Sequence, residues 1–354
     1  MPESTLFIPD ISGFTKFVKT TELNHSKHII EELINIIIVN GKDLFEIAEV
    51  EGDAVLMYNR SKLSPEDLIA ASKKIFVAFH KHLLSYEYNR VCECGACTTA
   101  IDLRLKFITH SGEMSLANYG AGSPKPFGDA VIVAHRLLKN KVPLDQYVLF
   151  TNDILQGHDL VLDGENHLTD ESLGDVVYRY LAIDHWHSEA IIDEKEVINK
   201  NVDLEVKSEA VIDVDAHTLH RFVSELKYRY LWNEGVDKVI FDEEAINNVG
   251  NQHFCVVNGK DLIFDTIKPE FDTGLSYGEV LKNPDPFRYT EINFFMTHES
   301  INSTRVELVV RLSVKWKLQL LLLPLIKRKL AKEGTKTLNQ LKVGAMKAQL
   351  EEAL

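Results

Sequence analysis

Short apolar runs separated by turn-forming residues fill the beginning of the chain. Residues 5–9 read as a buried strand that ends at Asp10, where a Ser-Gly pair supplies the turn out of the sheet. Residues 44–50 and 54–58 read as two further strands, joined by a tight turn that contains Asp53. The pattern predicts one aspartate at the end of a strand and a second at the tip of a hairpin.

A helix is predicted from Pro65 to about Leu84. Ser64 is a good N-cap residue, proline is favoured at the first helical position, and two acidic residues follow in the first turn. A strand is expected from Ile101 onward, and residues 178–183 read as the last strand of this half of the chain.

The second half has a different order of elements. Residues 188–203 are acidic and weakly patterned, which is typical of a linker. A strand over 205–214 and a helical segment over 216–230 follow, and a long closing helix is expected between Lys315 and Leu350. Between the two helical segments we expect several strands, among them 252–257, 262–267, 289–297 and 304–312.

Composition narrows the function classes. The 354 residues are 45% hydrophobic and 26% charged, a profile typical of globular domains, and the length allows two of them. A net charge of −14 argues against a general nucleic-acid binder. The sequence has no apolar run long enough for an integral membrane segment and no signal-peptide pattern at its start, so we expect a cytoplasmic protein.

The two aspartates suggest a metal site. Mg²⁺ prefers oxygen ligands, keeps several waters, and is commonly held by one or two carboxylates together with substrate phosphates. Asp10 and Asp53 would therefore suffice for chemistry on a nucleoside triphosphate. Each also has a simpler explanation, because aspartate is a common helix cap and a common turn former.

Four segments occur in an order that resembles the catalytic domain of class III nucleotidyl cyclases. They are residues 7–15 (FIPDISGFT), 49–58 (EVEGDAVLMY), 103–113 (LRLKFITHSGE) and 127–137 (FGDAVIVAHRL). The resemblance covers the first half of the chain. It implies an α+β fold with a ferredoxin-like cyclase catalytic domain over residues 1–187.

The resemblance implies roles for particular residues. Asp10 and Asp53 match the two metal-binding carboxylates for two Mg²⁺ or Mn²⁺ ions, with the backbone of Ile11 as a further ligand. Arg136 matches the arginine that stabilises charge on the phosphates, a role suited to a guanidinium. Ile132 stands where the family has an asparagine that binds the ribose, and the late phosphate-binding lysine has no clear counterpart near residues 173–175.

Two positions match the family's readers of the purine base. Glu49 corresponds to guanine recognition, and a carboxylate can accept hydrogen bonds from the N1–H and amino group of guanine. Lys125 occupies the second base-recognition position, where it fits neither the adenylate nor the guanylate pattern and could pair with Glu49. The sequence leaves the choice between ATP and GTP open.

The resemblance also implies a reaction and an assembly. In this family the metals activate the ribose 3′-hydroxyl for attack on the α-phosphorus, giving the 3′,5′-cyclic monophosphate and pyrophosphate. The metal residues and the arginine come from different subunits. A chain with one such domain would therefore act as a homodimer.

Three cysteines cluster as Cys92, Cys94 and Cys97 after the predicted helix. This spacing can surround a structural zinc ion, with His80, His82 or an external ligand as the fourth donor. Three reduced cysteines in a cytosolic loop explain the pattern equally well. Both interpretations stand.

Residues 204–354 resemble the START-like (SRPBCC) helix-grip superfamily in their element order and in the Val-Asp-Ala-His entry to the first helix. That fold often encloses an apolar cavity for a hydrophobic small molecule. Three functions are therefore open: an active purine nucleotide cyclase with a ligand-binding or regulatory second domain, a degenerate cyclase homologue that binds nucleotide without turnover, or a carrier of a hydrophobic ligand or lipid.

Overall fold

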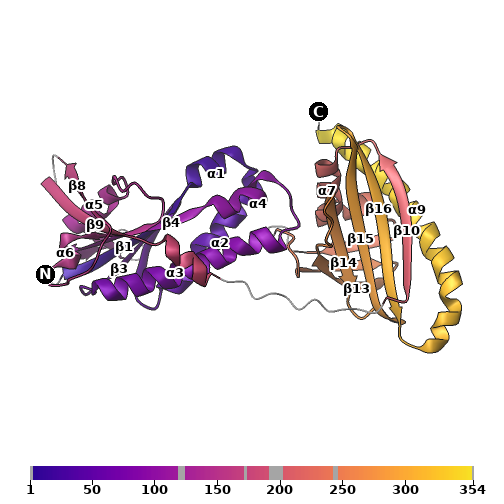
Figure 1. Ribbon diagram of the computed structural model, residues 1–354, viewed down its shortest axis with the longest axis horizontal. Helices are drawn as coiled ribbons and strands as arrows, with labels where there is room; N and C mark the ends of the chain where they lie inside the picture. Colours follow the sequence, from indigo (N-terminus) through magenta and orange to yellow (C-terminus); the bar gives the residue numbers. More distant parts are fainter. Residues whose placement is uncertain (1–2, 119–123, 171–173, 191–201, 242–245, 353–354) are drawn as a thin grey trace. The chain divides into compact units, whose positions relative to one another are not determined.

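The structure is a computed structural model that describes residues 3–118, 124–170, 174–190, 202–241 and 246–352 (Figure 1). The chain forms two compact units. One contains Met1–Glu87 and Gly95–Asp193, and the other contains Tyr88–Cys94 and Glu194–Leu354. Most of the predicted linker, residues 191–201, lies outside the described residues. Both units combine helices with a large sheet, so the mixed α and β class is confirmed.

The first unit is built on a seven-stranded sheet in the order β2-β3-β1-β4-β7-β9-β8. Strand β1 is central and runs antiparallel to both β3 and β4, whereas β4 and β7 are parallel. The strands are β1 (Glu3–Ser12), β2 (Glu46–Glu51), β3 (Ala54–Asn59), β4 (Arg104–Glu113), β7 (Tyr147–Thr151), β8 (Gly164–Asp170) and β9 (Gly174–Ala182), and β5 (Ser115–Ala117) pairs with β6 (Lys125–Phe127) in a separate ribbon.

Alternate residues of β1 point to opposite sides of this sheet, and both sides are buried. Leu6 and Ile8 pack in one core with helix α5 (Asp129–Leu137). Phe7 stacks on Phe45 on the other face, where α2 (Leu23–Gly41) ends against β3. The remaining helices are α1 (Phe14–Thr20), α3 (Pro65–Asn89), α4 (Gly95–Thr99) and α6 (Asn152–Leu155), with 3₁₀ turns η1 (Ala100–Asp102) and η2 (Asp184–Glu189).

Helix α3 is longer than the sequence predicts. It begins at Pro65 as expected but continues to Asn89, because Leu83 and Tyr86 both remain buried against the unit. The Tyr86 hydroxyl donates a hydrogen bond to the carboxylate of Glu32 on α2. This tertiary contact stabilises a last helical turn that has no strong helix signal of its own.

The second unit contains a seven-stranded sheet in the order β10-β16-β15-β14-β13-β12-β11, with antiparallel pairing throughout. Trp232 and Phe294 pack edge to face in its core with Leu338 and Leu341 of the closing helix. The elements are β10 (Leu204–Ile212), α7 (Ala216–Ser224), η3 (Leu226–Tyr228), α8 (Arg229–Trp232), β11 (Val236–Ile240), β12 (Gln252–Val257), β13 (Lys260–Ile267), β14 (Leu275–Leu281), β15 (Phe287–Ser300), β16 (Ser303–Val314), η4 (Lys317–Leu322) and α9 (Leu323–Glu352).

The predicted helical segment 216–230 is broken. Asp215 caps α7 by accepting a hydrogen bond from the Thr218 amide at 3.0 Å, but the chain becomes extended at Glu225. A separate short helix then carries Arg229 inward to Glu279 on β14. The closing helix was predicted correctly, and Pro324 lies in its first turn, where its missing N–H costs nothing.

Candidate functional site

Asp10 and Asp53 lie close together where the end of β1 meets the β2–β3 turn. Asp10 near the end of β1 is opposite Ala54, and the Ile11 amide donates to the Asp53 carbonyl oxygen at 3.0 Å. Partial burial, and then the negative charge of Asp10, raise the pKa of Asp53. Two carboxylates distant in sequence are thus close enough to repel each other.

A lysine that the sequence analysis missed completes this cluster. Lys106 is paired with Asp10 across the β1–β4 ladder, and its Nζ lies 3.0 Å from Asp10 Oδ2. Its charge also opposes the rise in the Asp53 pKa. The residue lies within the cyclase-like segment 103–113, and only the β1–β4 register shows that it faces the carboxylates.

The donor set fits a hard divalent cation. It offers carboxylate oxygens, which Mg²⁺ and Mn²⁺ prefer, and Asp53 has an unfavourable charge interaction that a cation would relieve. Lys106 supplies one positive charge to Asp10 but no comparable partner to Asp53. The cluster is therefore only partly neutralised by the chain itself.

The two candidate readers of the base pair with each other. Lys125 Nζ on β6 lies 2.7 Å from Glu49 Oε2 on β2, and both side chains are more than 40% exposed. An ion pair this exposed is weak and easily rearranged. The neighbouring Glu51 carboxylate lies 3.5 Å from Nδ1 of His135, so basic and acidic side chains alternate around Glu49.

Arg136 and Ile132 both belong to α5. The buried residues Ala130, Val133, Ala134 and Leu137 attach this helix to the sheet. Ile132 and Arg136 are one turn apart and share the other face, where Ile132 is 47% exposed. The position expected to bind ribose therefore presents an apolar side chain toward solvent.

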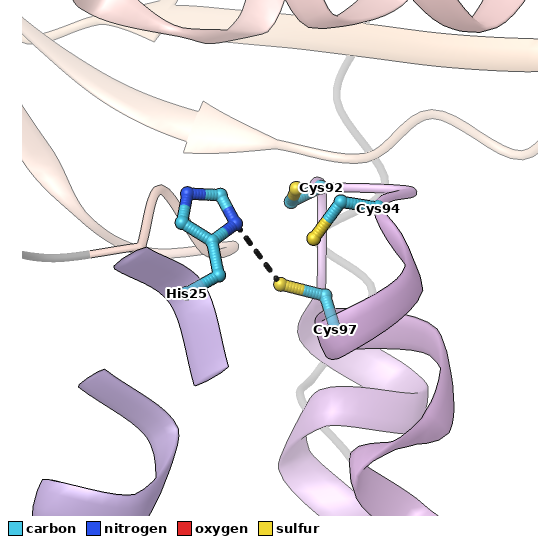
Figure 2. Close-up of side chains that lie close together, drawn as sticks. All are labelled: His25, Cys92, Cys94 and Cys97. Carbon is cyan, nitrogen blue, oxygen red and sulfur yellow. Dashed lines mark hydrogen bonds between the residues drawn. The ribbon is translucent and has the colours of Figure 1, made fainter. Parts of the chain in front are cut away.

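The cysteine cluster gains a fourth member that the sequence analysis missed. Side-chain donor atoms of His25, Cys92, Cys94 and Cys97 all lie within 4.8 Å of one another (Figure 2). Within the first unit, His25 Nδ1 lies 3.6 Å from Cys97 Sγ. His25 lies near the start of α2, and the rest of α2, the β2–β3 hairpin and α3 separate it from the cysteines, so no local pattern could have identified it.

The predicted fourth donors, His80 and His82, are wrong. His80 is buried in an aromatic cluster with Phe76, Phe79 and His187, where burial lowers its pKa to about 3. His82 lies 3.0 Å from the Glu32 carboxylate. Both side chains project from α3 to partners other than the cysteines.

The second unit contains a buried charge cluster. The Arg229 guanidinium binds the carboxylate of Glu279, which also accepts a hydrogen bond from the Tyr277 hydroxyl at 2.5 Å. Burial alone would raise the pKa of Glu279, but Arg229 and His253 outweigh it and hold that pKa below its ordinary value. The Glu279 carboxylate is thus bound by other groups of the chain, whereas among the described residues Arg229 Nε and both His253 ring nitrogens have no hydrogen-bond partner.

Comparisons with known proteins match part of the chain in each case. The family model "Protein of unknown function (DUF2652)" matches residues 30–147. The uncharacterized protein Rv2561/Rv2562 of Mycobacterium tuberculosis is 25% identical over 125 residues, which cover 35% of this chain and 58% of that protein. The chain thus matches a little over half the length of this curated relative.

Solved structures of two kinds are similar to the chain. A bacterial light-regulated adenylyl cyclase covers 50% of this chain and 88% of its own at 18% identity, with a TM-score of 0.37. The guanylate cyclase domain of RhGC from Catenaria anguillulae, solved with GTP, covers 51% and 96% at 16% identity and a TM-score of 0.33. A START superfamily protein from Mycobacterium smegmatis covers 42% and 99% at 20% identity and a TM-score of 0.31.

Proposed function

We propose that the first unit binds a purine nucleoside triphosphate with Mg²⁺ or Mn²⁺ and converts it to the 3′,5′-cyclic monophosphate and pyrophosphate. The observation that supports this proposal is the convergence of Asp10, near the end of β1, and Asp53, in the β2–β3 turn, with the pKa of Asp53 raised by partial burial and then by the charge of Asp10. The reaction type is inferred from the four sequence segments that resemble class III nucleotidyl cyclases.

Each chain residue has a defined task in this proposal. Asp10 and Asp53 would hold the metal ions, with the Ile11 backbone beside them. The ions, when bound, would activate the ribose hydroxyl and neutralise the pyrophosphate. Arg136 would stabilise charge on the phosphates from a second copy of the chain, which makes the active form a homodimer.

In this proposal, Glu49 and Lys125 recognise the purine base. A guanine could bind Glu49 only if Lys125 left it, and the exposure of this pair keeps that exchange inexpensive. In the absence of such an exchange, the Lys125 ammonium could donate to an acceptor on either purine. We therefore assign a purine and leave the choice between ATP and GTP to measurement.

One observation favours a second candidate function, nucleotide binding without turnover. Ile132 presents an exposed apolar side chain one turn before Arg136, where a hydrogen-bonding group is expected to orient the ribose. A bound nucleotide would then lack a contact that aligns its 3′-hydroxyl. The second unit would be a ligand-binding or regulatory domain in either case, and a hydrophobic small molecule remains the proposed ligand.

The decisive experiment incubates the purified full chain with each of the four ribonucleoside triphosphates and Mg²⁺ or Mn²⁺, with mass spectrometry of the products. We expect a purine cyclic monophosphate that is lost in Asp10→Asn and Asp53→Asn. Asp43→Asn, at an exposed acid paired with Lys74, is the matched control and should keep activity. Metal-dependent triphosphate binding by calorimetry without any product would support the second candidate, and neither binding nor product would refute both.

A further inference from the structure

We propose that His25, Cys92, Cys94 and Cys97 bind one Zn²⁺ ion in a tetrahedral site with one nitrogen and three sulfur donors. The ion would be structural, since four protein ligands leave no open position for a substrate. This site shares no residue with the proposed nucleotide site, so the two proposals can fail independently.

Chain connectivity brings three of the donors together. Cys92, Cys94 and Cys97 lie within six residues, so their sulfur atoms stay near one another wherever the segment lies. In a tetrahedral site with Zn–S bonds of about 2.3 Å, neighbouring donors are separated by about 3.4–3.8 Å. The observed donors lie within 4.8 Å of one another, so contraction by about 1 Å would complete the coordination sphere.

The fourth donor is fixed by contacts inside the first unit. The Glu22 carboxylate, just before α2, accepts hydrogen bonds from the Gly95 and Ala96 amides at 3.2 and 3.0 Å. These bonds hold the start of α4 against the start of α2, which brings Cys97 to His25. Figure 2 shows the imidazole and the Cys97 sulfur turned toward each other, with the other two thiols beside them.

The alternatives for these thiols explain less. In the described part of the chain no disulfide joins the cysteines. A histidine beside a cysteine can also form a nucleophilic pair, but Cys97 is only 1% exposed and offers its sulfur to no substrate. A closed metal site accounts for both the convergence and the burial.

The test measures zinc in the full chain purified without added metal, by elemental mass spectrometry. We expect about one zinc per chain, and its loss in Cys94→Ser and in His25→Ala. Cys255→Ser and His28→Gln are matched controls, because Cys255 lies on β12 and His28 is one turn further along α2 beside Glu32. Full zinc content in the Cys94→Ser variant would overturn the proposal.

A second measurement covers variants that fail to fold. Wild-type protein stripped of metal is titrated with Co²⁺, whose visible spectrum reports tetrahedral geometry and thiolate ligation. Thiolate-to-cobalt absorption with tetrahedral bands is the expected result. A chain that contains no zinc and takes up neither Co²⁺ nor Zn²⁺ would show that the cysteines serve another purpose.

In the second unit, we infer independently that η4 and the start of α9 bind the surface of an anionic lipid bilayer. Trp316, Leu318, Leu321 and Leu325 are 67%, 75%, 76% and 64% exposed. Single exposed apolar residues are ordinary, but a row of four large ones on one short segment marks an interaction surface.

The charge around this row identifies the partner. Lys315 precedes the row and pairs with Asp285, Lys317 lies between Trp316 and Leu318, and Lys327, Arg328 and Lys329 follow the row. From Lys315 the sequence has no acidic residue before Glu333. This basic segment stands out in a chain of net charge −14. Leucine and tryptophan beside clustered lysines are suited to an interfacial segment, in which apolar side chains enter the acyl boundary and cations meet phosphate headgroups.

Vesicle co-sedimentation tests this surface. The full chain should bind vesicles of phosphatidylcholine with phosphatidylserine, should bind phosphatidylcholine alone more weakly, and should lose at least about tenfold in affinity for the mixed vesicles in Leu318→Glu/Leu321→Glu. Ile301→Glu is the control, an 88% exposed position at the opposite end of β16. Equal binding by the double variant would refute the inference. Self-association that the double variant abolishes, without vesicle binding, would assign the surface to a second copy of the chain.

Discussion

The two units contain charge clusters of similar composition and opposite character. In the first unit, Asp10 pairs with Lys106, and the negative charge of Asp10 repels that of Asp53. The Asp10 and Lys106 side chains are 11% and 19% exposed. In the second unit, Arg229 and Glu279 are 4% and 1% exposed. Burial, and then the charge of Asp10, raise the pKa of Asp53, whereas in Glu279 the charges of Arg229 and His253 outweigh burial and lower the pKa.

This difference separates a charge cluster that stabilises the fold from one that can accept a ligand. The Glu279 carboxylate accepts hydrogen bonds from the Arg229 guanidinium and the Tyr277 hydroxyl, so removal of either Arg229 or Glu279 leaves an uncompensated charge inside the protein. The charge of the Asp53 carboxylate is only partly compensated by Lys106, and the side chain is only partly buried. A cation from solution can therefore bind it and lower its electrostatic energy. The following predictions test this contrast, from the largest expected effect to the smallest.

Glu279→Leu should destabilise the second unit by about 3–5 kcal/mol, because Arg229 would remain buried without its carboxylate. Urea unfolding followed by tryptophan fluorescence measures the change. The double variant Arg229→Met/Glu279→Leu should recover most of the loss, since it removes both charges. A single-variant cost below about 1 kcal/mol would mean that the pair is more hydrated than its burial indicates.

Asp10→Ala should reduce Mn²⁺ affinity by at least about tenfold while leaving the unfolding of the second unit unchanged. The loss follows from removal of a carboxylate oxygen ligand beside Asp53. Calorimetric titration with Mn²⁺ measures it, and Asp43→Ala provides a control acid outside the cluster. Unaltered Mn²⁺ binding in Asp10→Ala would place the metal elsewhere.

Lys106→Met should increase the affinity for Mn²⁺ alone by about fivefold, because the ammonium competes with the ion for Asp10. The matched control is Lys139→Met, which removes an exposed lysine just beyond α5. Equal increases in both variants would indicate a general effect of net charge. A decrease in Lys106→Met alone would mean that this lysine organises the site for the metal.

Asp53→Asn should stabilise the metal-free protein at neutral pH by less than about 1 kcal/mol and abolish stabilisation by Mn²⁺. Because the pKa of Asp53 is raised in the folded state, folding favours the protonated form, and stability falls as pH rises from the ordinary pKa of 3.8 through the raised value. The gain in Asp53→Asn should therefore disappear below about pH 3.8. Thermal unfolding at several pH values measures this, and a gain that persists at acid pH would contradict it.

Local signals predicted many elements well. The sequence placed β12 at residues 252–257 and the start of α3 at Pro65, because strand alternation, the Ser64 cap and the proline are local features. It failed at residues 225–228, where the helical pattern continues but the chain turns so that Arg229 can reach Glu279. Burial of that pair competes with local helix propensity and determines where α7 ends.

The sequence by itself determined the mixed α and β class, the turn position of Asp53 and the close spacing of three cysteines, because each depends on residues near one another along the chain; the predicted strand end at Asp10 was wrong, since β1 continues to Ser12. Only the tertiary structure decided that Lys106 faces Asp10, that His25 completes the cysteine cluster, and that His80 and His82 do not. Strand register and helix packing set these contacts, and neither leaves a periodic signal in the sequence.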